Sequence, residues 1–195
     1  AINTWVPTLI DTITTVISVP EDFATIQEAL DSAEVGYTIH VSPGTYFENI
    51  QWPDTDGLKL IGSGPDSTII DGSQMGRVIS VDWEDAVAPA EISGFKITNG
   101  FVPNYQRGGG IELEIVGEIL LSNLQIVNNE AYYGGGIYCG TNASPKLSNV
   151  SIINNHAYWS GGGIYCESSD PVFVNLTISN NTTSTGTDGP EGSGG

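Results

Sequence analysis

The sequence predicts an all-β solenoid in which each coil contributes three short strands, that is, a parallel β-helix. The phrase Gly-Gly-Gly-Ile occurs at residues 108–111, 134–137 and 161–164, which gives a period of about 26 residues. Similar phrases precede or follow these glycines: LSNLQIVNN from Leu121, LSNVSIINN from Leu147 and FVNLTISNN from Phe173. Within each phrase the apolar residues alternate, which is the period of a strand and not of a helix.

Each repeat divides into three predicted strands that bury alternate side chains. The first strand is the phrase itself, in which Leu124 and Ile126 point inward. The second strand follows the glycines, with Ile137 and Cys139 inward, and the third leads into the next phrase. No helical stretch separates the strands and the leucine-rich consensus is absent, so helical and leucine-rich repeat folds are excluded. Stacked coils would lie at the ~4.8 Å spacing of neighbouring strands.

Asparagines recur at two positions of the repeat. Amide side chains stacked from coil to coil can form hydrogen-bonded ladders. Asparagine also tolerates the left-handed backbone that a sharp corner requires. We therefore assign these residues a structural role rather than a role in ligand binding. The two predicted columns are Asn123, Asn149 and Asn175, and Asn128, Asn154 and Asn180.

A helical cap is predicted at the start of the solenoid. Residues 15–19 are the first predicted strand, and residues 22–34 are the predicted helix. Acidic residues suit the start of this helix, and Gly36 suits its end. A β-helix exposes strand edges and an apolar core at its end, so an amphipathic helix would cover both. The apolar residues with helical spacing are Phe23, Ile26, Ala29, Leu30 and Ala33.

Three regions follow from these elements: an arm at residues 1–14, the β-helix at 15–183, and a glycine-rich tail or truncated coil at 184–195. The tail stops where another coil is expected, so we predict that the last coil exposes apolar core. Either further coils or an anchor beyond the tail, or a second copy of the chain, would cover it. The arm is a candidate inter-subunit strand that would lie along this coil of a second copy. Head-to-tail contacts of this kind would build a homo-polymer. The arm residues expected to make the contact are Ile2, Trp5, Val6, Leu9 and Ile10.

Four successive phrases in the first half of the chain resemble a known family. They are ATIQEALDSA from Ala24, TIHVSPGTYFENI from Thr38, LKLIGSGPDSTIIDGS from Leu58 and ISGFKITNG from Ile92. The succession resembles the pectin lyase-like superfamily of right-handed parallel β-helices, over about residues 17–181. The later Gly-Gly-Gly-Ile and Asn-Asn phrases are similar to those of bacterial β-helix repeat proteins of the cell surface. The resemblance implies a right-handed coil and a secreted or surface protein.

The phrase Gly-Thr-Tyr-Phe-Glu at residues 44–48 matches the G-x-Y-x-E motif of pectin methylesterases. The motifs that carry the chemistry of that family do not occur: a Gln-Asp pair, an aspartate in a DFIFG-like strand and an Arg-Pro-Trp phrase. The signatures of polygalacturonases and of pectate lyases are absent as well. The resemblance therefore implies the fold and carries no activity. We favour a non-catalytic protein and leave the question of an enzyme open.

Charge and composition exclude several function classes. The 195 residues include 23 acidic and 5 basic side chains, which gives a net charge of −18 and an isoelectric point near 4.1. Such a surface repels nucleic acids and anionic membranes. No apolar run reaches the length of a membrane span, so no membrane insertion is predicted. Acidity, few lysines and abundant Thr, Ser, Asn and Gly favour an extracellular or cell-surface protein.

Acidic residues supply the candidate metal ligands. Glu112 and Glu114 are two residues apart in a predicted strand, so both are expected to face outward. Asp82, Glu84 and Asp85 form a second acidic group, in a predicted loop. Either group could bind Ca²⁺ through oxygen ligands. A solvated acidic surface explains them more simply, so no cofactor other than this candidate Ca²⁺ is predicted.

Aromatic residues form the most suggestive candidate surface. An aromatic pair at residues 132–133 recurs at 158–159, as one loop reproduced on two coils. Two further tyrosines are expected to stack beside it and to point outward. Exposed stacked rings bind sugar faces or form protein interfaces, although packing between neighbouring coils explains the same pattern. The candidate residues are Tyr132, Tyr133, Tyr138, Tyr158, Trp159 and Tyr165.

The two cysteines, Cys139 and Cys166, fall at equivalent inward positions of adjacent coils. We interpret them first as small core residues and second as a strained or partial disulfide. A Cα separation of ~4.8 Å lies within the range of disulfides, but parallel side chains place the Cβ atoms slightly too far apart. A metal site would need further ligands, and His40 and His156 are not placed beside the cysteines.

Two functions from different classes fit these observations. The first is a non-catalytic extracellular structural protein, either the subunit of a self-assembling surface filament or an adhesin or stalk. The alternative is a protein of the pectin lyase-like group that binds or degrades a polysaccharide on its outer strand face. Such an enzyme would need convergent carboxylates with an arginine or lysine, and the shortage of basic residues counts against it. The fold alone does not decide between the two functions.

Overall fold

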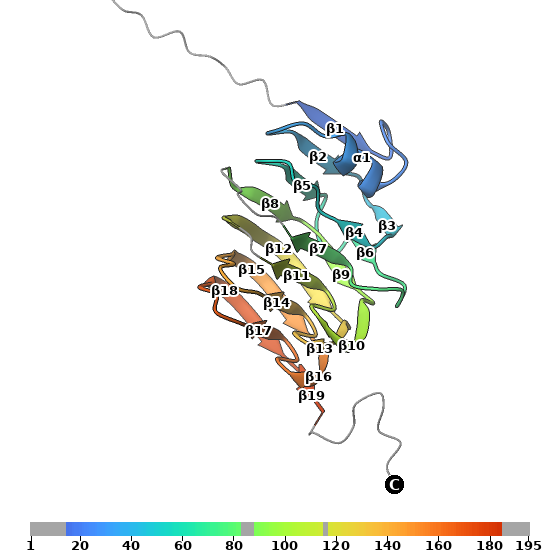
Figure 1. Cartoon of the computed structure of the whole chain (residues 1–195). Helices are drawn as coiled ribbons and strands as arrows, with labels where there is room; N and C mark the ends of the chain where they lie inside the picture. Colours follow the sequence, from blue (N-terminus) through green and yellow to red (C-terminus); the bar gives the residue numbers. More distant parts are fainter. Residues whose placement is uncertain (1–14, 83–87, 115–116, 185–195) are drawn as a thin grey trace, which may run out of the picture.

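The computed structural model describes residues 15–82, 88–114 and 117–184. Within these residues every pair of neighbouring strands is parallel. The strands stack coil upon coil in sheets of ten, five and four strands (Figure 1). The predicted parallel β-helix is therefore confirmed. The described residues contain a single helix, α1 (Ile26–Ser32), at the first coil, and it is not long and apolar enough to span a membrane.

The ten-stranded sheet, here called the long sheet, runs the length of the solenoid (Figure 1). One column of its strands is β1 (Val16–Val19), β2 (Thr38–Val41), β5 (Lys59–Gly62) and β8 (Ala90–Ser93). A second column is β3 (Gly44–Phe47), β6 (Thr68–Asp71) and β9 (Lys96–Thr98). Both columns pair with the long strand β12 (Ile119–Val127), and β15 (Lys146–Ile153) and β18 (Val172–Ser179) follow it.

Two shorter sheets complete the coils. The five-stranded sheet contains β4 (Ile50–Gln51), β7 (Ile79–Asp82), β11 (Ile111–Glu114), β14 (Ile137–Cys139) and β17 (Ile164–Cys166). The four-stranded sheet contains β10 (Phe101–Arg107), β13 (Glu130–Tyr133), β16 (His156–Ser160) and β19 (Thr182–Thr183).

The structure divides each later coil differently from the sequence prediction. The two strands predicted before and within each phrase are one continuous strand, as in β12, β15 and β18. These strands bend where Asn123, Asn149 and Asn175 adopt left-handed φ angles of 49°, 56° and 53°. The segment predicted as a loop forms β13 and β16 instead, because the buried Ala131 and Ala157 extend the core beneath it.

The next corner is also made by asparagines, as predicted. Asn128, Asn154 and Asn180 have φ angles of 57°, 56° and 54°, where the long sheet turns into the four-stranded sheet. The amide ladder predicted for this column is wrong, because no hydrogen bond joins the side chains of these three described residues. In the other column, Asn175 Nδ2 donates to Asn149 Oδ1, as predicted.

The buried amide ladder belongs to the second asparagine of each Asn-Asn pair. Both the backbone N–H and Nδ2 of Asn129 donate to Oδ1 of Asn155, at 2.9 and 3.0 Å. Asn155 makes the same two bonds to Asn181. Each amide thus satisfies buried polar groups that the corner would otherwise leave unpaired. The ladder fixes the register of the last three coils.

The triple glycines mark a close approach of neighbouring coils. Gly134 has a φ angle of 64°, which favours glycine. A Cβ added to Gly135 would stand 2.2 Å from the carbonyl oxygen of His156. Because this distance is far below van der Waals contact, any side chain there would push the coils apart. The repeated glycines therefore reflect coil stacking.

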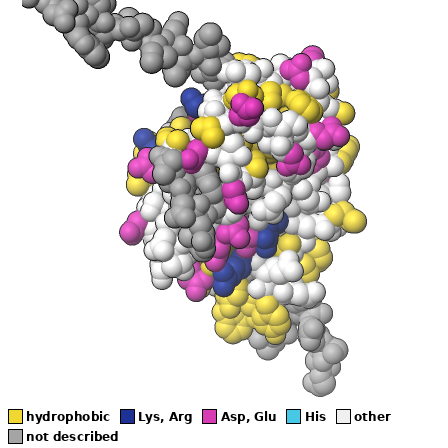
Figure 2. Space-filling model, turned by 45° about the horizontal axis from the view of Figure 1, so that its top comes forward, with side chains coloured by type: hydrophobic (Ala, Val, Ile, Leu, Met, Phe, Trp, Pro, Cys, Tyr) yellow, Lys and Arg dark blue, Asp and Glu magenta, His cyan; other side chains and the backbone are white. Residues whose placement is uncertain are grey.

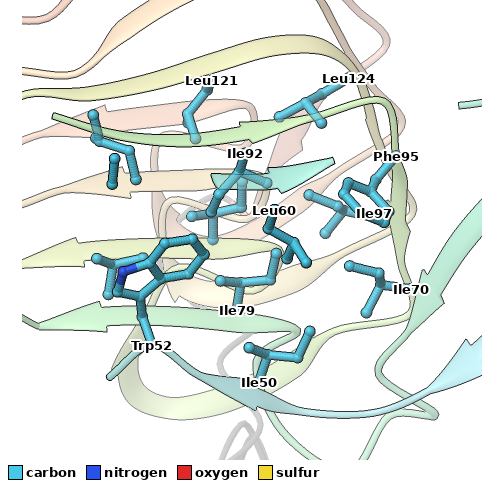
Figure 3. Packing of buried hydrophobic residues seen from close by; sticks show 14 of the residues in the cluster. Ile50, Trp52, Leu60, Ile70, Ile79, Ile92, Phe95, Ile97, Leu121 and Leu124 are labelled. Atoms are coloured by element: carbon cyan, nitrogen blue, oxygen red, sulfur yellow. The ribbon is translucent and has the colours of Figure 1, made fainter. Parts of the chain in front are cut away.

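The core consists of apolar columns inside the solenoid (Figure 3). Residues in the middle of a column are completely buried, and Leu60 and Leu121 are each 0 % exposed. Trp52 lies with Ile50 and Ile79 at one side of the same core in Figure 3. Burial of this apolar surface is the main contribution to the stability of the fold. One column contains the register partners Ile17, Ile39, Leu60, Ile92, Leu121, Leu147 and Phe173.

Helix α1 covers the first coil, as predicted, but it is shorter than the predicted range of 22–34. Thr25 is its N-cap and forms a capping box with Glu28, so the helix begins at Ile26. The helix buries Ile26 and Leu30 and contacts β1, β2 and β4. Ala33 already has an extended backbone, which ends the helix at Ser32.

Glu48 gives the Gly-Thr-Tyr-Phe-Glu phrase a structural role. Its carboxylate accepts hydrogen bonds from the backbone N–H groups of Ile26 and Gln27, at 2.9 and 3.0 Å. These N–H groups open α1 and have no partner within the helix. The Tyr46 hydroxyl donates to the carbonyl oxygen of Ser42 at 3.0 Å. The phrase thus joins the cap to the solenoid.

Part of the sequence prediction concerns residues outside the described ranges. These are the arm residues and the tail: Ile2, Trp5, Val6, Leu9, Ile10 and residues 185–195.

Candidate functional site

The outward face of the five-stranded sheet gathers several candidate residues. Ser80, Glu112, Tyr138 and Tyr165 are register partners on β7, β11, β14 and β17. Their side chains therefore form one outward row across four coils. Glu114 follows two residues after Glu112, so it lies on the same face.

A partly buried ion pair lies at the start of this row. Arg77 Nη1 binds Oε2 of Glu112, and the Ser80 hydroxyl donates to the same oxygen at 3.2 Å. Glu112 is only 9 % exposed. Burial raises the pKa of Glu112, while the Arg77 charge and the Ser80 hydrogen bond act in the opposite direction. The carboxylate is thus held by specific protein partners.

A second arginine, Arg107 at the end of β10, contacts the same face. Its Nη1 lies 3.1 Å from Oε1 of Glu114, and its Nη2 lies 3.9 Å from Oε2 of Glu167. Its guanidinium carbon lies 4.9 Å from the centre of the Tyr138 ring, which is a cation–π contact. Burial lowers the pKa of Arg107, but Tyr138 and the carboxylates outweigh it and raise the pKa. We call Arg77, Ser80, Arg107, Glu112, Glu114 and Glu167 the arginine–carboxylate cluster.

These contacts correct the expectation that Glu112 and Glu114 belong to a solvated acidic surface. Each carboxylate has an arginine partner, because both arginines of the sequence fold onto this face. In residues 15–82, 88–114 and 117–184, no three His, Cys, Asp or Glu side chains are grouped to hold a metal ion. Asp82 is exposed at the end of β7, and Glu84 and Asp85 lie outside the described residues. Calcium binding stays a prediction.

An aromatic cluster from consecutive coils lies beside the arginine–carboxylate cluster. The Tyr132 ring centre lies 4.5 Å from that of Tyr105, 4.9 Å from Tyr133 and 6.1 Å from Trp159. The planes of Tyr132 and Trp159 differ by only 9°. Tyr105 and Trp159 are 73 % and 56 % exposed. Tyr133 lies 5.1 Å from Tyr165, which connects these rings to the outward row of the five-stranded sheet. We call these five residues the aromatic cluster.

The structure changes two expectations for the aromatic residues. The rings at 132–133 and 158–159 lie on β13 and β16, not in loops. Tyr138 stacks on Tyr165 at 5.8 Å with planes 7° apart, as predicted, but it is only 1 % exposed. Arg107 and Tyr165 both contact the Tyr138 ring, so it supports the face from beneath.

Tyr158 makes its contacts with other residues. Its hydroxyl donates to Oε1 of Glu130, and its ring meets the His156 ring edge to face at 5.2 Å. Burial and the bond to Glu130 raise the pKa of Tyr158 to about 12. Of the six predicted aromatic residues, four therefore belong to the aromatic cluster, Tyr138 supports it, and Tyr158 pairs with an acidic residue.

Sequence reasoning misses several residues of this face. Tyr105 and Arg107 lie in β10, whose pairing with β13 shifts between Val102 and Arg107, so no repeat spacing marks them. Glu167 lies just beyond β17. One usable signal was the scarcity of basic residues, since the few arginines of an acidic chain are natural partners for its carboxylates. The missed residues are Arg77, Ser80, Tyr105, Arg107 and Glu167.

The two clusters together offer complementary chemistry on one face. Figure 2 shows basic and acidic side chains side by side, next to a patch of hydrophobic side chains. Flat exposed rings provide apolar contact area with few rotatable bonds. Guanidinium groups donate hydrogen bonds, and carboxylates accept them. A ligand with flat apolar faces and several hydroxyl groups fits this combination.

Comparison with solved structures supports the fold assignment. Pectin methylesterase PemA from Erwinia chrysanthemi is similar with a TM-score of 0.51 and 13 % identity, over 85 % of this chain and 66 % of that one. A pectin methylesterase in complex with a hexasaccharide is similar with a TM-score of 0.53 and 14 % identity, over 89 % of this chain and 67 % of that one. The chain thus spans about two thirds of the length of these enzymes. At such low identity the likeness concerns the fold, and it confirms the predicted pectin lyase-like architecture.

Comparison with sequences and families completes the assignment. A search of the curated proteins finds no match. A family model described as "right handed beta helix region" matches residues 47–192, which is most of the chain. The chain therefore belongs to the right-handed β-helix family.

Proposed function

We propose that this protein is an extracellular polysaccharide-binding β-helix that holds a sugar chain against its aromatic and arginine–carboxylate clusters. The observation that carries the proposal is the contact of the half-buried Tyr132 with the exposed Tyr105 and Trp159, beside Arg107 and its carboxylate partners. This is the binding form of the alternative function from the sequence. The extracellular location rests on composition and on the resemblance.

The arrangement of the rings suits an extended ligand. Tyr105, Tyr132 and Trp159 come from β10, β13 and β16, which stack along the solenoid axis. A chain of sugar rings running along the axis would meet one aromatic ring after another. The pectin methylesterase complex contains a hexasaccharide, so a protein with this fold can hold a chain of that kind.

The net negative charge of the protein disfavours anionic polysaccharides as ligands. The net charge is −18, and both arginines of the site are already paired with glutamates. A polyuronate such as pectate would be repelled at long range, and the charges of both guanidinium groups are already balanced by glutamates. We therefore propose a neutral or amino-bearing polysaccharide as the ligand.

Binding without cleavage is the simpler form of the proposal. Acid–base catalysis needs carboxyl groups free to exchange protons with a substrate. Glu112 instead accepts from Arg77 and Ser80, and Glu114 is paired with Arg107. We assign these carboxylates to the support of the face.

A binding assay with matched variants tests this proposal. The purified chain would be titrated calorimetrically with a neutral glucan, an amino-bearing chitosan and a polyuronate. We expect binding to the first or second, and Trp159→Ala to lose about 1 kcal/mol, roughly a fivefold rise in Kd. Phe47 is the control because it is 72 % exposed and lies on β3, on another sheet. Preference for the polyuronate, or equal losses in Trp159→Ala and Phe47→Ala, would contradict the proposal.

A second candidate function is self-assembly, and a separate observation favours it. The last described strand of the long sheet, β18, exposes about half of four of its five large apolar residues, while Leu176 packs against the core: Val172 53 %, Phe173 46 %, Val174 47 % and Ile178 53 %. An exposed apolar edge strand is a template for pairing with another chain. We propose that a second copy lays its residues 1–14 along this edge, which would give a head-to-tail filament or stalk.

Electron microscopy with mass determination tests assembly. Fibres with a regular axial repeat are expected from the full chain. Deletion of residues 1–14 should abolish them and leave a folded monomer with an unchanged circular dichroism spectrum. Polymers that persist without the arm would exclude this mode of contact.

A further inference from the structure

We propose that Cys139 and Cys166 form a thiol pair that oxidises to a disulfide between two successive coils, with Cys166 as the attacking thiol and Cys139 as the resolving thiol. This pair lies outside both clusters described above. The inference does not depend on the proposed function.

The two cysteines face each other across one step of the five-stranded sheet. They are register partners at the ends of β14 and β17. The Cα separation of neighbouring strands, ~4.8 Å, lies within the range found in disulfides. The preceding pair, Tyr138 and Tyr165, is stacked with ring planes 7° apart, so the strands are held in this register. Both cysteines are free thiols in the structure.

The environments of the two thiols differ, which assigns their roles. Cys139 is buried and Cys166 is exposed. A hydrogen bond with the Cys139 thiol lowers the pKa of Cys166 to about 6, and the same contact together with burial raises the pKa of Cys139. The exposed sulfur is therefore the thiolate near neutral pH, and thiolates are the nucleophiles in disulfide exchange.

The reaction requires a low-molecular-weight disulfide as the oxidant. The Cys166 thiolate attacks one sulfur of that disulfide, breaks its S–S bond and releases one small thiolate. The Cys139 thiol then attacks the Cys166 sulfur of the mixed disulfide, and the second small thiolate leaves with the proton of Cys139. Two cysteines are oxidised to one disulfide, and one small disulfide is reduced to two thiols.

The position of β17 allows the closure. Parallel side chains place the Cβ atoms slightly farther apart than disulfides prefer, so one strand must shift by a small amount. Within the described residues β17 ends its sheet and pairs only with β14. An edge strand can make this shift without disturbing a further strand.

Oxidation of the full chain with oxidised glutathione tests the proposal. The wild-type protein should lose both free thiols in an Ellman titration and the mass of two hydrogen atoms, and proteolysis should yield one linked peptide with both cysteines. Cys139→Ala should stop at a glutathione adduct on Cys166. Cys166→Ala should keep its buried thiol unreacted under native conditions.

Two further readouts separate this chemistry from an unfolding artefact. The rate at which the wild-type protein forms the adduct on Cys166 should reach half its maximum at a pH below the ordinary cysteine pKa of about 8.5. Cys139→Ala, which lacks the hydrogen bond to Cys166, should need a higher pH to reach half its maximum rate. Circular dichroism would verify that each variant is folded, and Cys139→Ser and Cys166→Ser replace any that is not. A wild-type protein that stops at the glutathione adduct, keeps two free thiols, or forms only intermolecular disulfides would overturn the proposal.

Discussion

Among the described residues the two ends of the solenoid belong to one apolar column, yet a helix covers only the first coil. Ile17 in the first coil is 8 % exposed, whereas Phe173 at the other end of the column is 46 % exposed. Helix α1 contacts β1 and β2 at the first coil. Among the described residues no helix lies over β18.

This difference shows that the apolar side chains of one coil are buried only where a neighbouring coil or the helix packs against them. Ile126, Ile152 and Ile178 occupy one position on three successive coils. The first two are 0 % exposed, and the third is 53 % exposed. The residue type and the local strand are the same, so the burial depends on what stacks next to the coil.

The largest expected effect tests this dependence on the neighbouring coil. Ile152→Ala should lower the free energy of unfolding by about 3–4 kcal/mol, because it leaves a cavity between two coils. Ile178→Ala, the matched control, should lower it by only about 1 kcal/mol because half of that side chain is already exposed. Urea unfolding of both variants measures the difference. Equal losses would refute the comparison of the two ends.

A second change probes the polar ladder that accompanies the apolar columns. Asn155→Ala should lower the free energy of unfolding by about 2–3 kcal/mol, because it removes the acceptor for two N–H groups of Asn129. Asn181→Ala serves as the comparison at the last rung, where the side chain is only partly buried. We expect a smaller loss there, again by urea unfolding. A larger loss of unfolding free energy in Asn181→Ala than in Asn155→Ala would contradict this role of the buried ladder.

A third change weakens the covered end. Glu48→Ala should lower the free energy of unfolding by about 1–2 kcal/mol, because two N–H groups at the start of α1 lose their carboxylate acceptor. Hydrogen exchange of the α1 amides should accelerate at the same time. Asp54→Ala, at an exposed acidic residue nearby in sequence, is the control and should leave both unchanged. Unchanged exchange in Glu48→Ala would mean that the carboxylate does not hold the cap.

The smallest effect concerns pH at the less covered end. The pKa of Tyr158 is about 12 in the folded protein and about 10 in an unfolded chain. The folded state therefore keeps a proton that the unfolded state loses, so stability should fall as the pH rises from about 10 to about 12. Tyr158→Phe removes this contribution and should flatten the slope in that window, as measured by thermal unfolding at each pH. An unchanged slope would contradict the pairing with Glu130.

Much of the fold was predictable because it repeats. The period of the glycines and the alternation of apolar residues predict stacked parallel strands, and left-handed corners at Asn128 and Asn154 follow from residue type. The boundaries were less predictable. The strand β12 bends at Asn123 without a break, and β13 forms where a loop was predicted. Both features depend on stacking against adjacent coils.

The candidate site was predictable only in part. The spacing of 26 residues matches Tyr132 with Tyr158. The ring that stacks on Tyr132 is Trp159 instead, because the pairing of β13 with β16 shifts between Ala131 and Tyr133. Arg107 and Tyr105 could not be found in this way, because they lie in a shifted stretch of β10 that later coils do not reproduce. The burial of Tyr138 also escaped prediction, since Arg107 covers a ring that its strand position directs outward.

The sequence by itself determined the periodic features: the coil length, the inward columns, the asparagine corners and the amphipathic cap. These features depend on local residue type and spacing, and the same residue types recur at the same spacing in successive coils. The tertiary structure decided which side chains meet on the outer face. Arg77 and Glu112 are 35 residues apart, and the register that stacks one coil on the next brings them into contact. Because that register comes from the buried columns and the buried amide ladder, the arginines and their carboxylate partners carry no spacing signal of their own.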